Sequence, residues 1–350
     1  MMMQKFKVNI RVRTFLTCFV AGCLLAGLTP VMPAGAQVGV PLLLEKPAVE
    51  LAAAEKAEKK KEGAPPTCGP IITDACLPID TGKFSVQVTW ALSFYMGNYS
   101  PNWRYISAGG DFYTLYMPVK FAYGVTKDME VYVVIPFVTN WAKNVNTNLA
   151  GPNGERSASY SGIGDMTLIG KYNLLAEGDF LPAVSAVAGF ATIPTGHASR
   201  LNPGRLLQDA VGTGSLSFTT GVNLFKYLKP FLVHSQIWMN NPVNIYKIRG
   251  EDNPQNVRNH DWVNFNLAVE YPFTKDKKWI FLMEMYSSWT WSNIYTTLGF
   301  QSPVTLLGVQ PAIEYVATDK LSLAAGAAFD LVGKFNNRKF TPMVTVLYTF

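Results

Sequence analysis

The feature that most constrains the fold is a long series of segments in which large apolar residues alternate with small or polar ones. In residues 84–94, Phe, Val, Trp and Leu take every even position, and Ser, Gln, Thr and Ala take the odd positions between them. Successive side chains of a β-strand point to opposite faces, so this pattern predicts a strand with one apolar and one polar face. About twelve such segments follow one another from residue 83 to residue 350, each of the roughly 10–13 residues that a tilted strand needs to cross a membrane.

The connections between these segments alternate in length. Short connections such as 126–128 and 226–229 follow every second segment, and long ones such as 141–161 and 194–213 separate the others. Outer-membrane barrels show this asymmetry, because their periplasmic turns are short and their outer loops are longer. The sequence therefore predicts an all-β fold, a closed antiparallel transmembrane β-barrel of about twelve strands over residues 83–350.

The last predicted strand ends on an aromatic residue. In residues 340–350 one face carries Phe, Val and Tyr side chains, and the other carries three Thr residues. A closing strand that ends in Phe350 resembles the terminal signal of bacterial outer-membrane barrels, so we expect recognition by the barrel-assembly machinery and pairing with the first strand. The alternative is the closing strand of a soluble β-sandwich, which has no reason to keep the alternation of short and long connections.

The first residues read as an export signal. Four basic residues precede an apolar run over 15–28, and Ala34-Gly35-Ala36 fits a small-residue cleavage site. We therefore expect a signal peptide over residues 1–36 and a mature protein in the cell outer membrane, surrounded by its lipid. Cys23 ends a segment that resembles a lipoprotein cleavage box, so its lipidation is the alternative to cleavage after Ala36.

Composition supports a barrel and argues against several other classes. Charged residues make up 15% and aromatic residues 13% of the chain, and the mean hydropathy is only +0.11, because lipid-facing and lumen-facing residues average out along each strand. Removing residues 1–36 deletes four basic and no acidic residues, which lowers the formal net charge from +6 to +2. No basic field remains to attract nucleic acid. Since no phosphate-cradling Gly loop and no clustered thiolate site are present, we expect no cofactor and no metal.

The segment between the signal and the barrel, residues 37–82, has a different character. Its residues 49–62 are rich in Ala, Glu and Lys, which predicts a short helix. Cys68 and Cys76 remain after export to an oxidising compartment, so we expect a disulfide between them. The segment is either a solvated periplasmic arm or a plug that enters the barrel.

Several motifs occur in an order that resembles one known family. They are Gly162–Tyr172, Ala191–Gly196, Gly212–Phe218 and Ala268–Thr274. In this order they resemble the MetA-like outer-membrane transporters, which are named after the phenol meta-cleavage degradation pathway, and the resemblance covers roughly residues 83–350. It implies a barrel channel that passes small hydrophobic or aromatic molecules, and it does not extend to the segment before the barrel.

The polar faces of the predicted strands carry ionisable and aromatic side chains that would face a lumen. Ionisable groups at membrane depth are tolerated only where they face water or each other. They form either a salt-bridged interior that stabilises a narrow barrel or a polar conduit whose charges set selectivity. The candidates for the solute path are Lys120, Glu130, Lys171, His234, Gln236, Trp238, Glu270, Glu284, Tyr286, Glu314 and Asp330, and further aromatic residues on this face are Tyr116, Tyr132 and Phe225.

These features predict an outer-membrane channel for the passive passage of small, hydrophobic or aromatic solutes. The first alternative is a structural or surface-binding barrel with a blocked lumen. The second is an outer-membrane lipid hydrolase, because His197 and Ser199 have the spacing seen in outer-membrane phospholipase A. They lie in a Pro- and Gly-rich loop without an orienting third residue, so we expect no enzyme activity.

Overall fold

The structure is a computed structural model. The residues that it describes are 67, 69–198, 200–242, 246–248, 255–257, 261–290, 294–296, 299–301 and 304–350. All of these residues belong to one compact unit within residues 62–350.

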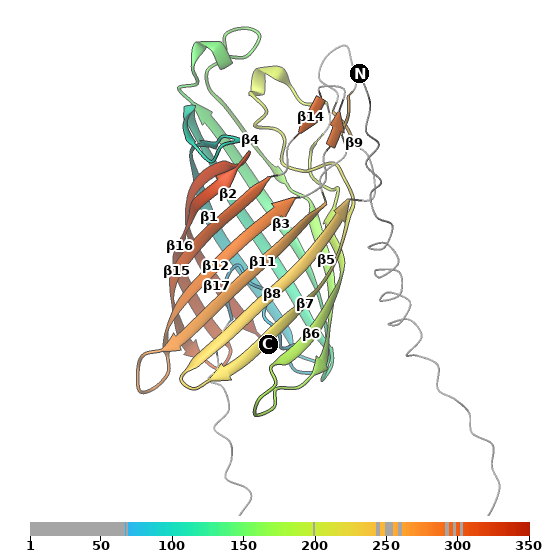
Figure 1. Cartoon of the computed structure of the whole chain (residues 1–350), viewed down its shortest axis with the longest axis vertical. Helices are drawn as coiled ribbons and strands as arrows, with labels where there is room; N and C mark the ends of the chain where they lie inside the picture. The colour runs from blue at the N-terminus through green and yellow to red at the C-terminus, as the bar shows by residue number, and fades with distance from the viewer. Residues whose placement is uncertain are drawn as a thin grey trace, which may run out of the picture. The chain divides into compact units, whose positions relative to one another are not determined.

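Long antiparallel strands make up this unit (Figure 1). They are β1 (Phe84–Tyr99), β2 (Tyr105–Thr126), β3 (Met129–Lys143), β4 (Ala158–Ile163), β5 (Met166–Leu175), β6 (Ala183–Ile193), β7 (Ser217–Leu228), β8 (Phe231–Pro242), β11 (Trp262–Pro272), β12 (Trp279–Thr290), β15 (Thr305–Thr318), β16 (Leu321–Lys334) and β17 (Asn337–Thr349). Among the described residues these thirteen strands form one sheet. Because β4 and β5 both pair with β3, as one interrupted strand, the sheet has twelve positions.

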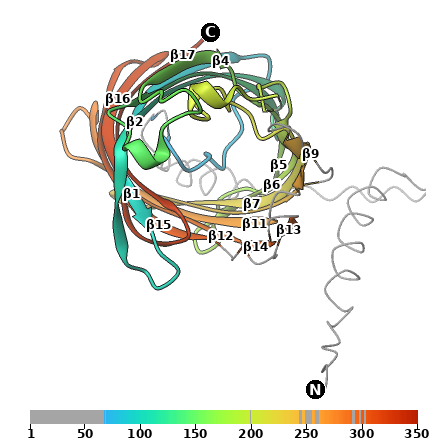
Figure 2. The same ribbon diagram turned by 90° about the horizontal axis from the view of Figure 1, so that it is seen from above.

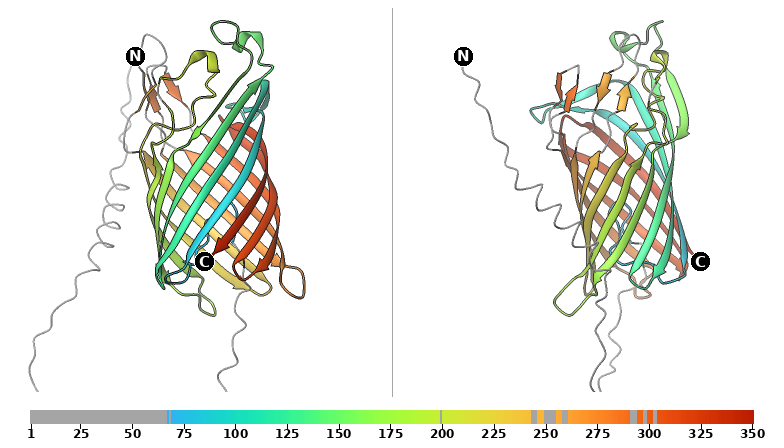
Figure 3. Two further views of the ribbon diagram at one scale, coloured as in Figure 1. Left: turned by 180° about the vertical axis from the view of Figure 1, so that it is seen from behind. Right: turned by 90° about the vertical axis from the view of Figure 1, so that its right-hand side faces the viewer.

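The sheet closes on itself into a barrel, as Figure 2 shows along its axis. Strand β1 pairs with β2 on one side and with β17 on the other, in a register that places Val88 opposite Val346. Strand β2 pairs in turn with β3, so the ring has no free edge. The predicted twelve-stranded antiparallel barrel and the predicted pairing of its first and last strands are confirmed. The strands tilt with respect to the barrel axis (Figure 3), as closure of a sheet requires.

The two ends of the barrel differ. Short turns join β2 to β3, β7 to β8 and β15 to β16 at one end, and long loops lie at the other (Figure 1). The long loops carry two 3-10 turns, η1 (Thr147–Leu149) and η2 (Pro203–Arg205), and two small hairpins, β9 (Tyr246–Ile248) with β10 (Gln255–Val257) and β13 (Ile294–Thr296) with β14 (Gly299–Gln301). The turn end is therefore the periplasmic end and the long-loop end is the outer one. Among the described residues, no helix has the length and apolar character needed to cross a membrane.

Each strand has one outward and one inward face, in the predicted register. On β17, Val344 is 48% exposed, whereas Thr345, the next residue, is 1% exposed. On β1, Trp90 is likewise exposed and Thr89 is buried. A closed barrel with an apolar outer surface is the arrangement that a bilayer requires, because closure lets neighbouring strands pair their backbone groups and leaves no free edge. The protein is an outer-membrane β-barrel.

The two faces of β1 should differ sharply in their tolerance of charge. We expect Val88→Arg, which places a cation in the hydrocarbon layer, to lower the free energy of unfolding by about 2–4 kcal/mol. The matched change Gln87→Arg, one residue away and beside an internal cavity, should be tolerated. An unfolding titration of the two variants in lipid vesicles measures the difference, and equal effects would mean that the assigned register is wrong.

Candidate functional site

A segment that precedes β1 lies inside the barrel (Figure 2), towards its periplasmic end (Figure 1). We call the described residues from Thr67 to Asp80 the internal arm. At one end of the arm, Thr67 Oγ1 donates to Glu314 Oε2 at 2.7 Å. At the other end, Ile79 N donates to Glu130 Oε2 at 2.9 Å. The wall of the barrel thus holds both ends of the arm through carboxylate side chains.

Three consecutive residues of the arm bind one carboxylate on β12, the strand next to β15 in the sheet. Glu284 on β12 is fully buried and accepts hydrogen bonds from three consecutive backbone N–H groups. The distances are 2.8 Å from Ile71 N, 3.1 Å from Ile72 N and 2.8 Å from Thr73 N. A buried charge is tolerable only when its hydrogen-bonding capacity is used, and here the backbone of the arm uses it.

Asp74 of the arm is the centre of a second group of contacts. Its carboxylate lies 3.0 Å from Lys120 Nζ and 3.6 Å from Lys171 Nζ, and Asn223 Nδ2 donates to it at 2.8 Å. Its backbone N–H donates to Gln236 Oε1 at 2.7 Å. These partners come from four different strands, β2, β5, β7 and β8, so one arm residue ties a large part of the wall together.

The charges around Asp74 compensate one another. Lys171, whose side chain is 1% exposed, lies 3.2 Å from Glu130 Oε1 as well as near Asp74, and it donates to Ala75 O at 2.8 Å. Two ammonium groups, those of Lys120 and Lys171, therefore face two carboxylates. A buried charge group of this kind is stable while it is complete, and removal of one member leaves an uncompensated charge in a low-dielectric interior.

The structure places all eleven candidates for the solute path on the inner face of the barrel. The arm directly contacts Lys120, Glu130, Lys171, Gln236, Glu284 and Glu314. The others pair within the wall: His234 Nε2 lies 3.1 Å from Glu270 Oε1, and Tyr286 Oη donates to Asp330 Oδ1 at 2.8 Å. The side chains face inward as expected, but sequence reasoning did not identify Asp74, the arm residue that brings three of them together.

Two aromatic candidates lie against glycines of the neighbouring strand. Tyr286 is opposite Gly308, and Trp238 is opposite Gly221. A Cβ atom at Gly308 would come within 2.2 Å of the Tyr286 ring, and one at Gly221 within 2.6 Å of the Trp238 ring. Because glycine has no side chain, both rings can lie against the wall of the barrel. There, Trp238 Nε1 donates to Asn223 Oδ1 at 2.7 Å.

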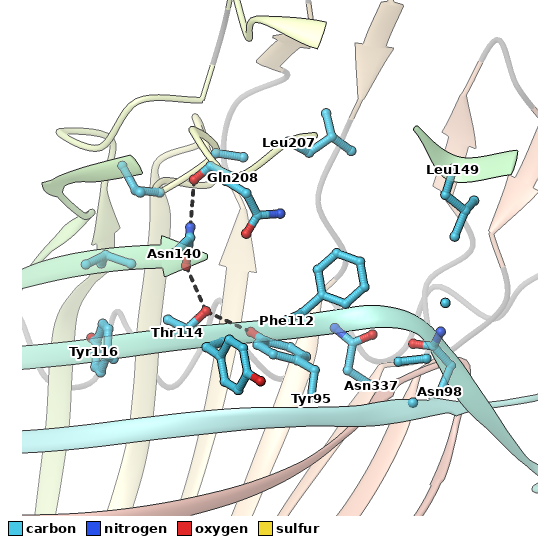
Figure 4. Close-up of a pocket in the computed structure, with 17 residues that line it drawn as sticks. Tyr95, Asn98, Phe112, Thr114, Tyr116, Asn140, Leu149, Leu207, Gln208 and Asn337 are labelled. Atoms are coloured by element: carbon cyan, nitrogen blue, oxygen red, sulfur yellow. Dashed lines mark hydrogen bonds between the residues drawn. The ribbon is translucent and has the colours of Figure 1, made fainter. Parts of the chain in front are cut away.

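Above the arm, the outer half of the barrel holds a cavity of about 570 Å³, which we call the outer cavity (Figure 4). A row of polar side chains from three adjacent strands and one loop lines it. Thr114 Oγ1 donates to Asn140 Oδ1 at 2.7 Å, and Asn140 Nδ2 donates to Gln208 O at 2.9 Å. Tyr95 Oη lies 3.4 Å from Thr114 Oγ1. Sequence reasoning missed Asn140 and Gln208 as site residues, because both lie where strand alternation ends.

A second cavity, of about 370 Å³, lies between the arm and the wall, and we call it the inner cavity. Arm residues Pro70 to Ala75 line one side, and Gln87, Lys120 and Trp238 are among the residues on the other. Tyr116 on β2 lines the inner cavity and the outer cavity alike. Although it points inward, Tyr116 is 40% exposed, because its ring stands in open space between the two cavities.

The wall next to Tyr116 is interrupted between β4 and β5. A third cavity, of about 360 Å³, lies there, and its lining includes Tyr116, Gly164 and Asp165. Asp165 binds the loop that follows β6, since its carboxylate accepts from Gly196 N at 3.0 Å and from Thr213 N at 2.6 Å. Tyr116 thus borders all three cavities.

Comparison with solved structures shows the fold. The chain superposes on the COG4313 outer membrane channel from Pseudomonas putida F1 with a TM-score of 0.63 and 14% sequence identity, over 81% of this chain and 100% of that one. The chain has the fold of an outer-membrane channel barrel. Looser likenesses are those to the autotransporter NalP translocator domain from Neisseria meningitidis, with a TM-score of 0.41, 9% identity and coverage of 77% and 89%, and to the Ralstonia pickettii toluene transporter TbuX, with a TM-score of 0.37, 11% identity and coverage of 78% and 90%. No protein-family model and no curated protein matches the chain.

Of the two residues considered for a lipid hydrolase, the structure describes only His197. His197 Nδ1 lies 2.9 Å from the backbone O of Asp209, within the long loop that follows β6. Ser199 lies outside the described residues. In the same described ranges, no group of three or more His, Cys, Asp or Glu side chains is arranged to hold a metal ion.

Cys76 packs against the wall at the periplasmic end. It is buried, and its Sγ lies 3.4 Å from Ser185 Oγ and 3.3 Å from Asn223 O. Cys68, its predicted partner, lies outside the described residues, so the disulfide stays a prediction. The same holds for the signal peptide over 1–36 and the helix within 49–62.

Proposed function

We propose that the protein is a channel through which small, uncharged and largely apolar or aromatic solutes diffuse across the outer membrane. The observation that carries the proposal is the series of two cavities that meet at Tyr116. The outer cavity leads from the long-loop end, and the inner cavity reaches down to the internal arm. Cavities of a few hundred cubic ångströms suit solutes of one or two rings.

The electrostatics of the interior favour neutral solutes. A channel that selects ions presents charged rings or carbonyl groups to the permeating ion. Here the positive charges of Lys120 and Lys171 are compensated by the carboxylates of Asp74 and Glu130. The carboxylate of Glu284 accepts hydrogen bonds from the backbone of the arm. A permeating ion would therefore have to exchange its hydration shell for groups that are already paired.

Two further observations support this proposal. The motifs between residues 162 and 274 resemble those of the MetA-like transporters. The solved structure with the TM-score of 0.63 is described as an outer membrane channel, and we propose the same general role for this chain. Membership of the MetA-like family is likewise part of the proposal.

The internal arm is the feature that favours the second candidate function, a structural or surface-binding barrel with a blocked lumen. Since it occupies the periplasmic end of the lumen and is bound to both sides of the wall, a permanently docked arm would make a structural or surface-binding barrel. In a channel, the arm is the last barrier, and it shifts when a solute passes from the inner cavity to the periplasm.

Variants of Tyr116 test the channel. Tyr116→Ala joins the two cavities and should raise the uptake of ring-sized neutral solutes such as toluene several-fold, whereas Tyr116→Trp narrows the junction and should lower it. The measurement is initial uptake by cells that carry each variant, compared with a strain that lacks the protein. Tyr123→Ala is the matched control, since Tyr123 lies on the same strand but is exposed on the outer face.

The same uptake measurement can contradict the proposed channel. If uptake is the same in the deletion strain, the wild type and both Tyr116 variants, across a panel of aromatic and aliphatic solutes, the lumen does not conduct them. The structural barrel with a blocked lumen is then the better description.

A further inference from the structure

The outer cavity has a lining that can distinguish one neutral solute from another. We propose that it binds uncharged molecules that combine an apolar body with one hydrogen-bonding group, such as an aromatic alcohol, and that Asn140 selects them. This inference rests on the proposed function only in treating the outer cavity as the outer end of the solute path.

The polar row of the cavity can accept and donate. The Thr114 hydroxyl has a single proton, and the 2.7 Å contact with Asn140 Oδ1 uses it. The contact of Thr114 Oγ1 with Tyr95 Oη is longer, at 3.4 Å, and the Tyr95 oxygen is the acceptor in it. The contact with Gln208 O uses one of the two N–H groups of Asn140. A hydroxyl or carbonyl group of a solute therefore meets a donor and an acceptor side by side.

Apolar side chains face the polar row from the outer rim. Leu149 in η1 and Leu207, two residues after η2, are 53% and 65% exposed. Both line the outer cavity, and Figure 4 shows them above Phe112 and away from the Thr114–Asn140 pair. The cavity thus combines apolar side chains at its outer rim with the polar row, which matches a solute with one polar group on an apolar body.

The same lining excludes ions. None of the described residues that line the outer cavity is charged. A carboxylate or ammonium group that enters a cavity without a counter-charge loses hydration and gains no ion pair in return. The cavity should therefore reject charged analogues of the molecules that it binds.

Direct binding to the full chain in lipid nanodiscs tests the inference. The probes are benzyl alcohol, toluene, benzoate and benzylammonium, observed by saturation-transfer NMR, with protein-free nanodiscs as the baseline. We expect the wild type to bind benzyl alcohol more tightly than toluene and to bind neither ion. Asn140→Leu, which keeps the size of the side chain, should reduce the preference for benzyl alcohol over toluene about three- to tenfold, the effect of one neutral hydrogen bond. Thr139→Val is the matched control, because Thr139 is the next residue of β3 and faces outward.

A charge-changing variant separates recognition from a structural role. Asn140→Asp retains the shape of the side chain and adds an anion, so it should gain binding of benzylammonium. Damage to the fold cannot produce such a gain. An unchanged benzyl alcohol preference in Asn140→Leu, or no benzylammonium binding by a folded Asn140→Asp, overturns the inference.

The two proposals fail in different experiments. Selective binding together with uptake equal to that of the deletion strain would contradict the channel and leave the binding site standing. Uptake through the protein without any preference between benzyl alcohol and toluene in the binding assay would contradict the site and leave the channel standing.

Discussion

Glu284→Ala should raise the single-channel conductance of the barrel in planar bilayers. The change removes the only carboxylate that accepts from Ile71, Ile72 and Thr73 in the described structure. Each buried N–H group left without an acceptor costs about 1–3 kcal/mol, and the arm regains those hydrogen bonds by leaving the lumen for water. We expect the conductance to approach that of a variant lacking residues 37–80, which sets the upper limit.

Glu270→Ala is the control for this experiment. Glu270 is also fully buried, but its partner is His234 of the wall rather than the arm. Its loss should therefore leave the conductance close to the wild-type value. If Glu284→Ala conducts no better than Glu270→Ala, the three hydrogen bonds do not keep the arm in place.

Lys171→Met should give the largest loss of stability of any single replacement in the interior. Methionine keeps most of the volume, but Asp74 and Glu130 lose a shared cation that is itself 1% exposed. Breaking a buried ion pair in this way costs about 3–5 kcal/mol. A urea titration of the barrel in lipid vesicles, followed by tryptophan fluorescence, measures the change in the free energy of unfolding.

Two comparisons show whether charge is the cause. Lys83→Met removes a cation from the exposed pair with Asp80, and a surface pair contributes at most about 1 kcal/mol. The double variant Lys171→Met/Glu130→Gln should recover part of the loss, because it also removes a carboxylate that Lys171→Met leaves uncompensated. A double variant less stable than Lys171→Met alone would count against the electrostatic explanation.

The parts of the fold that touch lipid could be predicted from the sequence. In β1 and β17 the bilayer on one side and the lumen on the other impose a strict alternation, so Trp90 and Val344 were assigned outward and Thr89 and Thr345 inward. The extra structure lies in the outer loops. The two 3-10 turns and the hairpins β9–β10 and β13–β14 belong to these loops, and no strand alternation marks them in the sequence.

The site was predictable only in part, for a related reason. Alternation shows that Lys171, Glu284 and their neighbours face inward, but it cannot show which groups they meet. The partners of Asp74 are Lys120, Lys171 and Asn223, which are 46 to 149 residues away in the chain, and the arm itself has no period. Asn140 was missed because its role depends on the fold of the loop that brings Gln208 to it.

The covalent link between the arm and β1 has a kinetic consequence. The arm continues directly into the first strand through Gly82 and Lys83, where Gly82 N donates to Gly124 O at 2.8 Å. It is therefore an intramolecular ligand of the lumen, and a short tether holds such a ligand at an effective concentration in the millimolar range. In the channel that we propose, the arm returns after a solute displaces it in a first-order step, whose rate does not depend on how much protein the membrane contains. Each barrel then opens and recloses independently of its neighbours, and a separate peptide with the arm's sequence would need about millimolar concentrations to close an armless barrel equally well.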